Sequence, residues 1–190
     1  DRGWNEDPPL ANPAFVRMWW LRCKDLIDSY KPDLLYFDNG VNLRVLDPLK
    51  ERVAAYYYNR AADWGKDVSI VTKWVAYAPD NDDRHQIGAV IDFEKVGKRS
   101  PSGIRPGPWM VDDTIGSTWG YTDGMTIGSA GAILGKLIDT VSKGGFYLLN
   151  IAPKADGTIP DDQRAVLLEI GAWLGRNGDA IYGTHTWTRF

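Results

Sequence analysis

Helical and strand patterns alternate along this chain, and the strands are short and apolar over their whole length. The segment 34–37 reads LLYF, which leaves no face for water, and it lies within a strand predicted over 33–38. Further strands are predicted over 68–74, 89–94, 109–112 and 146–151, and helices over 12–30, 46–65, 129–145 and 161–178. This alternation is typical of an α/β protein whose parallel sheet is covered by helices. A barrel and an open doubly wound sheet both fit the pattern.

Capping residues define the predicted helix ends. Asn12 and Pro13 form an N-cap and first helical position, and Asp47 is predicted as the N-cap of the next helix. Gly65 is expected to end that second helix, and Gly178 is expected as the glycine that follows the last one.

Polar side chains recur where the predicted strands end. Asp38 follows LLYF, Lys73 follows SIVT, Glu94 follows VIDF, and Asn150 follows FYLL. In (β/α) barrels, catalytic residues lie at the carboxyl ends of strands, where the βα loops open to solvent. Two carboxylates at that edge can share nucleophilic and acid/base work.

Local sequence leaves non-catalytic roles open. Asp38 is equally suited to begin the turn at Asn39-Gly40. For Glu94, local sequence alone favours a solvated acid beside Lys95 and Lys98. Turn or loop-fixing roles are favoured for three other polar residues: Asn150, Asp112 and Asp113.

Composition excludes several classes of function. The 190 residues correspond to one domain or part of one, and the formal net charge of −3 argues against a nucleic-acid or anionic-membrane partner. No glycine-rich phosphate loop follows a strand, and Cys23, His85 and His185 have no metal-ligand spacing. We therefore expect no cofactor, no metal and no membrane span. Cys23 lies in a helical run and is expected to be a buried structural thiol.

Aromatic residues are abundant, with nine Trp and nine Tyr. Most are expected to pack the core and the helix–sheet interfaces. Sugar-binding clefts also favour these side chains, because each has a flat apolar face and a polar edge.

Several ordered motifs make this sequence resemble the family 29 glycoside hydrolases, the α-L-fucosidases. YKPDLLYFDNG is similar to the nucleophile strand of that family, which typically reads Y-x-P-D-hydrophobic-W-F-D-G. The later runs PWMVDDTIGSTWGY, VSKGGFYLLNIAPKADG and GAWLGRNGDAIY are similar to further family motifs in the same order, and the resemblance covers about residues 12–187. The departures are Tyr36 for the usual Trp, Asn39 inserted before Gly40, Phe146 for Asn and Ala152 for Gly.

The resemblance implies a retaining exo-glycosidase that removes terminal α-L-fucose from fucosylated oligosaccharides or glycoconjugates. Asp38 falls on the nucleophile of the family, and Glu94 falls on the acid/base position of one branch that reads D-x-E-R-G. Asp38 is then ionised at the start of the reaction and Glu94 protonated. Lys73 and Trp74 resemble the Y-K-W segment of the family and Trp119 falls on the tryptophan of W-G-Y, so these three residues are expected to contact the substrate.

The resemblance also implies that residues 1–190 are the second half, about strands 4–8, of a (β/α)8 TIM-like barrel, since a complete barrel takes about 250 residues. The first strands of the family, which carry its fucose-gripping residues, and its C-terminal β-sandwich have no counterpart here. We expect another chain or a further segment to complete the site. An inactive or structural half-barrel subunit and a non-catalytic carbohydrate-binding protein are the alternatives. Secreted, periplasmic and lysosomal locations are all consistent with the family.

Overall fold

A computed structural model describes residues 12–43, 46–73, 75–77, 87–98 and 100–190. The chain forms two compact units, one ending at Asp92 and the other beginning at Phe93. Five strands occur in the order β1-β2-β3-β4-β5, and the strand pairs β1–β2, β2–β3 and β4–β5 are parallel. Because a doubly wound sheet reverses its strand order at a switch point, this sequential order confirms the barrel alternative. The fold is α/β and corresponds to part of a (β/α) barrel.

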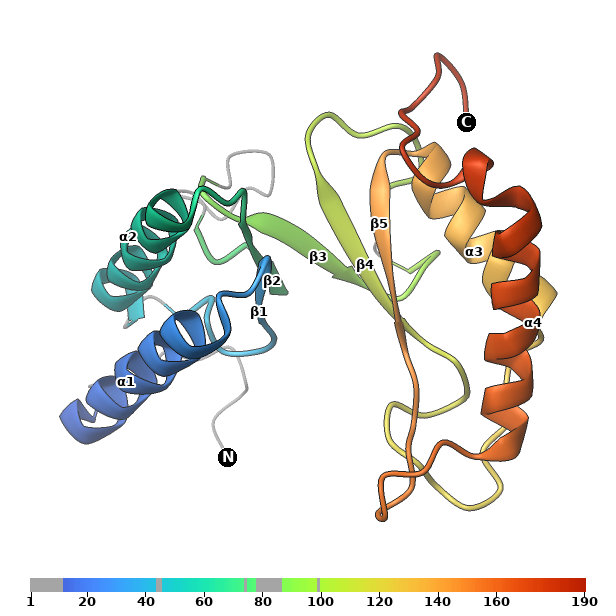
Figure 1. The fold of residues 1–190 in the computed structure, drawn as a ribbon, viewed down its shortest axis with the longest axis horizontal. Helices are drawn as coiled ribbons and strands as arrows, with labels where there is room; N and C mark the ends of the chain where they lie inside the picture. Colours follow the sequence, from blue (N-terminus) through green and yellow to red (C-terminus); the bar gives the residue numbers. More distant parts are fainter. Residues whose placement is uncertain (1–11, 44–45, 74, 78–86, 99) are drawn as a thin grey trace. The chain divides into compact units, whose positions relative to one another are not determined.

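The first unit begins with two helix–strand pairs (Figure 1). They are α1 (Pro13–Tyr30) with β1 (Leu34–Phe37) and α2 (Asp47–Trp64) with β2 (Ser69–Lys73). The strand β3 (Val90–Glu94) follows, and its first three residues belong to this unit. The Asn12 side chain accepts a hydrogen bond from the backbone N–H of Ala14, so the predicted N-cap is confirmed. Gly65 ends α2 in the left-handed conformation, as predicted.

The predicted cap of α2 was wrong by one residue. Leu46 is the N-cap and has helical backbone angles, and Asp47 is the first residue of the helix. Its carboxylate instead accepts from Lys50 Nζ at 2.6 Å, one turn along the helix, where a negative charge also suits the helix dipole.

One side of β1 and β2 packs against the helices. Leu35 and Ile70 are register partners on the two strands, and they are buried against α1 and α2 residues in one cluster whose helical members are Cys23, Ile27, Val53 and Tyr57. Fully burying an aliphatic or aromatic side chain of this kind contributes about 1.5–3 kcal/mol. Cys23 is buried, as predicted, and burial raises the pKa of its thiol to about 11.

Strand alternation sends a different set of side chains to the opposite face. In β1 and β2 this face carries Tyr36 and Val71, which are register partners, and then Lys73, whose register partner on β3 is Asp92. Lys73 and Asp92 are both buried, so these strands are apolar toward the helices and partly charged on the other side.

The second unit contains the remaining elements (Figure 1). They are β4 (Trp109–Thr114), α3 (Ala130–Ser142), β5 (Gly145–Asn150), α4 (Asp161–Asn177) and a 3-10 turn (Gly178–Ala180). β4 is two residues longer than predicted. Gly178 does not end α4 as a left-handed glycine, because its φ is −57° and the chain continues into the 3-10 turn.

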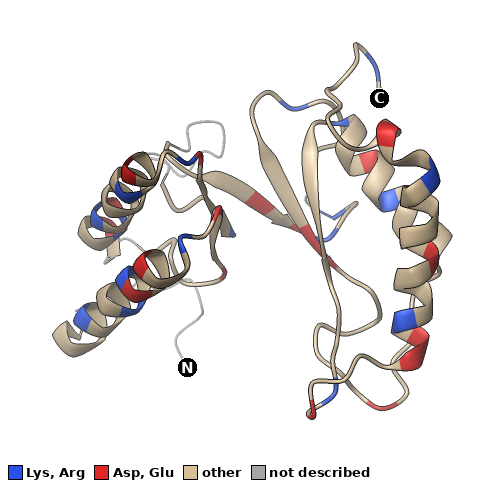
Figure 2. Ribbon diagram, viewed as in Figure 1, with Lys and Arg blue, Asp and Glu red and all other residues tan. Residues whose placement is uncertain are grey.

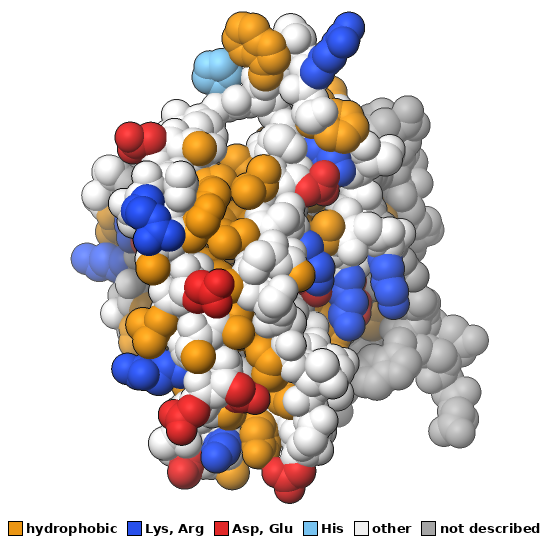
Figure 3. Space-filling model, turned by 90° about the vertical axis from the view of Figure 1, so that its right-hand side faces the viewer, with side chains coloured by type: hydrophobic (Ala, Val, Ile, Leu, Met, Phe, Trp, Pro, Cys, Tyr) orange, Lys and Arg blue, Asp and Glu red, His pale blue; other side chains and the backbone are white. Residues whose placement is uncertain are grey.

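The core of this unit lies between β5 and the two helices. Tyr147, Leu149 and Ile151 alternate along the chain toward Ile133, Leu134 and Ile170 of α3 and α4. On the other face of β5, Phe146 is 57% exposed and Leu148 is 43% exposed. Figure 3 shows hydrophobic side chains standing among charged ones on the outward face of this unit.

Trp109 fixes the close pairing of β4 with β5. Its indole lies so near Gly145, its register partner, that a Cβ at Gly145 would be 2.5 Å from the ring. The same indole makes an edge contact with Phe93 at 6.0 Å between ring centroids and donates to the carbonyl of Lys143.

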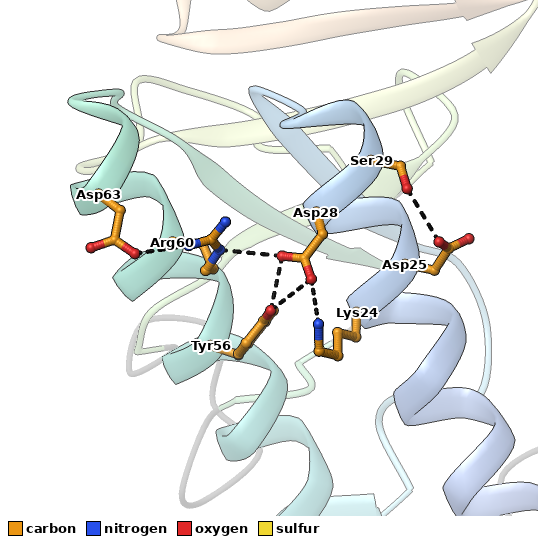
Figure 4. A network of polar contacts seen from close by, with 7 residues as sticks. All are labelled: Lys24, Asp25, Asp28, Ser29, Tyr56, Arg60 and Asp63. Atoms are coloured by element: carbon orange, nitrogen blue, oxygen red, sulfur yellow. Dashed lines mark hydrogen bonds and ion pairs between the residues drawn. The ribbon is translucent and has the colours of Figure 1, made fainter.

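A polar network joins α1 to α2 on the outside of the first unit (Figure 4). The Asp28 carboxylate accepts from Lys24, from the Tyr56 hydroxyl and from Arg60 Nε at 3.2 Å, and Arg60 also pairs with Asp63. The hydrogen bonds from Lys24 and Tyr56 lower the pKa of Asp28 below its usual value.

This network predicts an acid dependence of stability. Because the pKa of Asp28 is lowered in the folded state, its contribution is present above the unfolded value of about 3.9 and is lost as the pH falls through the folded value. Asp28→Asn should lower the thermal midpoint at neutral pH and flatten its decline below about pH 4. Thermal unfolding followed by circular dichroism tests this. Asp25→Asn, one turn earlier on α1, is the control, and identical curves for both variants would contradict the assignment.

Candidate active site

Two of the predicted site residues meet at the carboxyl ends of β1 and β2. Phe37 is the register partner of Thr72, so Asp38 and Lys73 lie side by side as the next residues. Lys73 Nζ is 3.2 Å from Asp38 Oδ1. The Lys73 side chain is 6% exposed and the Asp38 side chain 59% exposed, so a buried ammonium holds a carboxylate that solvent reaches. Since burying an unpaired ammonium is costly, the pair favours one position for both groups.

A second acid lies beside the same lysine. Asp92 is the register partner of Lys73 and is 2% exposed. Its Oδ2 accepts a hydrogen bond of 2.8 Å from the Tyr36 hydroxyl, which comes from β1 on the same face. Sequence reasoning missed Asp92 and this contact. The available signal was an acid in the middle of the apolar strand VIDFE, where a carboxylate needs partners to be buried. Figure 2 shows acidic positions within the strands β3 and β4 themselves.

Glu94 is the last residue of β3 and lies in the second unit, half-buried. Lys95 follows it with φ of 61°, a left-handed backbone that is uncommon for residues other than glycine. The amide of Lys95 donates to the carbonyl of Asp112 on β4 at 2.8 Å. The strand therefore ends abruptly after Glu94, and such backbone conformations are found most often near functional sites.

Trp119 lies in the loop after β4 and is 37% exposed. The ammonium of Lys95 lies 5.4 Å from the centre of its indole ring. The side-chain amide of Asn150, at the end of β5, donates to the carbonyl of Trp119 at 2.7 Å. Asn150 thus satisfies a backbone carbonyl, as predicted, and it anchors the loop that contains Trp119.

The structure brings Asp38 and Lys73 together in the first unit, and it places Glu94 and Trp119 in the second unit. Trp74 lies outside the described residues. Asp113 fixes structure, as predicted, but from within β4, where it pairs with Lys136 of α3 at 2.8 Å.

Across the described parts of the chain, no group of three or more His, Cys, Asp or Glu side chains has an arrangement that suits a metal ion. None of the helices in those same ranges is both long enough and apolar enough to cross a membrane.

Comparison with known proteins gives one consistent result. Residues 3–179 match the family model described as alpha-L-fucosidase. The chain is 34% identical over 168 residues to tissue alpha-L-fucosidase of Mus musculus and 40% identical over 174 residues to plasma alpha-L-fucosidase of Rattus norvegicus, covering 86% of this chain in each case. Its fold is similar to that of the Thermotoga maritima alpha-fucosidase crystallised in complex with fucose, with a TM-score of 0.73, 32% identity and 94% of this chain covered.

The matched region is a part of each of these proteins. The chain spans 35% of the length of the mouse and rat relatives and 37% of the Thermotoga maritima chain.

The contact between Tyr36 and Asp92 predicts a specific stability loss. Tyr36→Phe removes a donor from a buried carboxylate and should lower the free energy of unfolding by about 1–3 kcal/mol. Tyr121→Phe is the matched control, because the Tyr121 hydroxyl donates to Asp123 at 3.0 Å on the exposed surface. Urea unfolding measures both variants. Equal losses would show that burial of Asp92 does not strengthen the contact.

Proposed function

Because this chain belongs to the alpha-L-fucosidase family, we propose that it carries the two catalytic carboxylates of a retaining exo-glycosidase, with Asp38 as nucleophile and Glu94 as acid/base. The substrates would be fucosylated oligosaccharides or glycoconjugates with terminal α-L-fucose. The observation that carries the proposal is the placement of Asp38, a solvent-accessible carboxylate at a strand end with a buried ammonium 3.2 Å away.

In the first step an Asp38 oxygen attacks the anomeric carbon of fucose, and the bond to the leaving oxygen breaks. Glu94 gives its proton to that oxygen, so the aglycone leaves as an alcohol and a glycosyl ester remains on Asp38. In the second step Glu94 takes a proton from water, which attacks the same carbon. Fucose leaves with its original anomeric configuration, and the Asp38 carboxylate is restored.

Lys73 supports the nucleophile in this scheme. Its ammonium is buried and lies 3.2 Å from one oxygen of Asp38, which holds the carboxylate in place. Positioning of this kind supplies a large part of an enzymatic rate enhancement. Trp119, a residue that is 37% exposed, is proposed to pack against the sugar, and Trp74 is proposed to contact it as well.

The same proposal includes completion of the barrel by a further segment or another chain. β1 is the first strand in the sheet order, and among the described strands its partner is β2. An open edge of a parallel sheet is costly in water, and Phe146 and Leu148 expose apolar surface on β5. A non-catalytic carbohydrate-binding module is disfavoured, because both carboxylates are present.

The mutational test separates the two acids. Asp38→Ala should abolish hydrolysis of a nitrophenyl α-L-fucoside, since it removes the covalent step. Glu94→Ala should slow substrates with poor leaving groups by about 10²–10⁴-fold and activated aryl fucosides much less, because these need little protonation. Azide, acting as a small nucleophile, should restore product formation in both variants.

Steady-state kinetics and product analysis give the readout, with Glu169→Ala on the exposed face of α4 as the control. Equal losses on both classes of substrate would count against Glu94. A failure of azide with both variants would contradict the two-carboxylate scheme.

Completion of the barrel is tested by size. The 190-residue chain alone should associate with itself or with a partner, because its open edge and exposed apolar side chains need cover. It should show little fucosidase activity in that form. Light scattering after gel filtration, with activity measured across the peak, provides the test. A uniform 21.3 kDa monomer with full activity would refute this part of the proposal.

A further inference from the structure

A pocket of about 390 Å3 lies in the second unit at the carboxyl ends of β3 and β4. Its walls come from the turn after β3, from the residues that follow β4 and from the first two turns of α3. Small-molecule sites occupy about 300–1,000 Å3, so a single sugar residue fits this size. The carboxyl ends of strands are also the face on which barrel enzymes bind their substrates.

The pocket is cationic. Lys95, Lys98 and Lys136 line it together with a single acid, Asp113. Lys136 Nζ is 2.8 Å from Asp113 Oδ2, and Asp113 Oδ1 accepts from the amide of Thr114, so this carboxylate is already engaged. Within the described residues, Lys95 and Lys98 have no carboxylate within ion-pair distance. Two positive charges therefore remain to attract an anion.

The other walls resemble those of a sugar site. The side chains of Ile115, Ile127 and Ile133 supply apolar surface, and Ser117 and Thr126 supply hydroxyl groups at the rim. A sugar ring has an apolar C–H face and a polar edge, which suits such a combination.

Lys95 connects this pocket to the proposed catalytic residues. It follows Glu94 directly in the chain, and its ammonium lies 5.4 Å from the centre of the Trp119 ring, which is the proposed platform for the sugar. A ligand that extends from Trp119 past Lys95 would reach the cationic pocket.

We propose that this pocket binds an anionic group, a sulfate ester or a carboxylate, on the saccharide to which fucose is attached. The inference rests on the proposed function for the identity of the ligand, and it narrows the substrates to fucosylated glycans that carry negative charge. Charge-assisted hydrogen bonds from Lys95 and Lys98 would hold the anion, and Lys136 would contribute from the opposite wall.

The test measures binding to the 190-residue chain by titration calorimetry at low ionic strength. The probes are N-acetylglucosamine 6-sulfate, glucuronic acid, unmodified N-acetylglucosamine and inorganic sulfate. We expect saturable binding of at least one charged sugar, with an affinity that falls as salt is added because the lysines are near the surface. The charged sugar that binds more tightly identifies the anion as sulfate or carboxylate.

Variants then locate the binding. Lys95→Gln with Lys98→Gln should weaken the affinity for the charged sugar by about tenfold or more. Lys154→Gln is the matched control, because Lys154 is exposed in the same unit and also lies near an aromatic ring, that of Tyr121. It should leave the affinity unchanged.

Four results would overturn the proposal: no saturable binding of either charged sugar, unchanged affinity in the double variant, equal affinity for the neutral sugar, or equal affinity for inorganic sulfate. Binding is measured without hydrolysis, so its failure is distinct from failure of the fucosidase assignment. Fucoside hydrolysis without binding would contradict the pocket alone. Binding without fucoside hydrolysis would contradict the proposed function alone.

Discussion

The parallel strands of the first unit place two chemically different sets of side chains on their two faces. In the first unit Leu35 and Ile70 face the helices, and Tyr36, Lys73 and Asp92 face the other way. Burial against the helices anchors the backbone, because those contacts are made by the same strands that carry the charges. The charged groups are therefore fixed by packing that lies behind them. This separation allows the buried ammonium of Lys73 to be held at the end of β2, where it pairs with the carboxylate of Asp38.

The two acids on the charged face of the first unit differ in their exposure to solvent. Asp92 is enclosed and receives the Tyr36 hydroxyl, whereas the Asp38 side chain is 59% exposed. Two acids near one lysine thus have different surroundings: Asp92 is enclosed, and Asp38 is open to solvent. The contact between Lys73 and Asp38 therefore fixes the orientation of an exposed carboxylate by means of a buried ammonium.

Much of this arrangement was predictable from local sequence. Periodicity located the five strands and four helices of the described residues. Asn12 and Gly65 marked helix ends, because the side chain of Asn and the backbone of Gly have strong positional preferences. The predictions that Asp47 is an N-cap and that Gly178 is a left-handed glycine after α4 were wrong. Both roles depend on backbone angles, and the residue type alone does not determine these angles. The contacts of Tyr36 with Asp92 and of Lys95 with Trp119 join separate elements, so they could only be seen once the strands were in register.

The absence of a side chain at Gly145 also affects the direction in which the Glu94 side chain points. The Trp109 indole occupies the space that a Cβ there would fill, and Phe93 rests against the edge of that indole. Phe93 and Glu94 are consecutive on β3, so they point to opposite faces of the strand. The contact of Phe93 with Trp109 on one face of β3 therefore fixes the direction of the Glu94 side chain on the other face. A methyl group added at Gly145 would displace the Trp109 ring and, through it, Phe93. The Glu94 carboxyl group would then change direction, although the methyl group does not contact it.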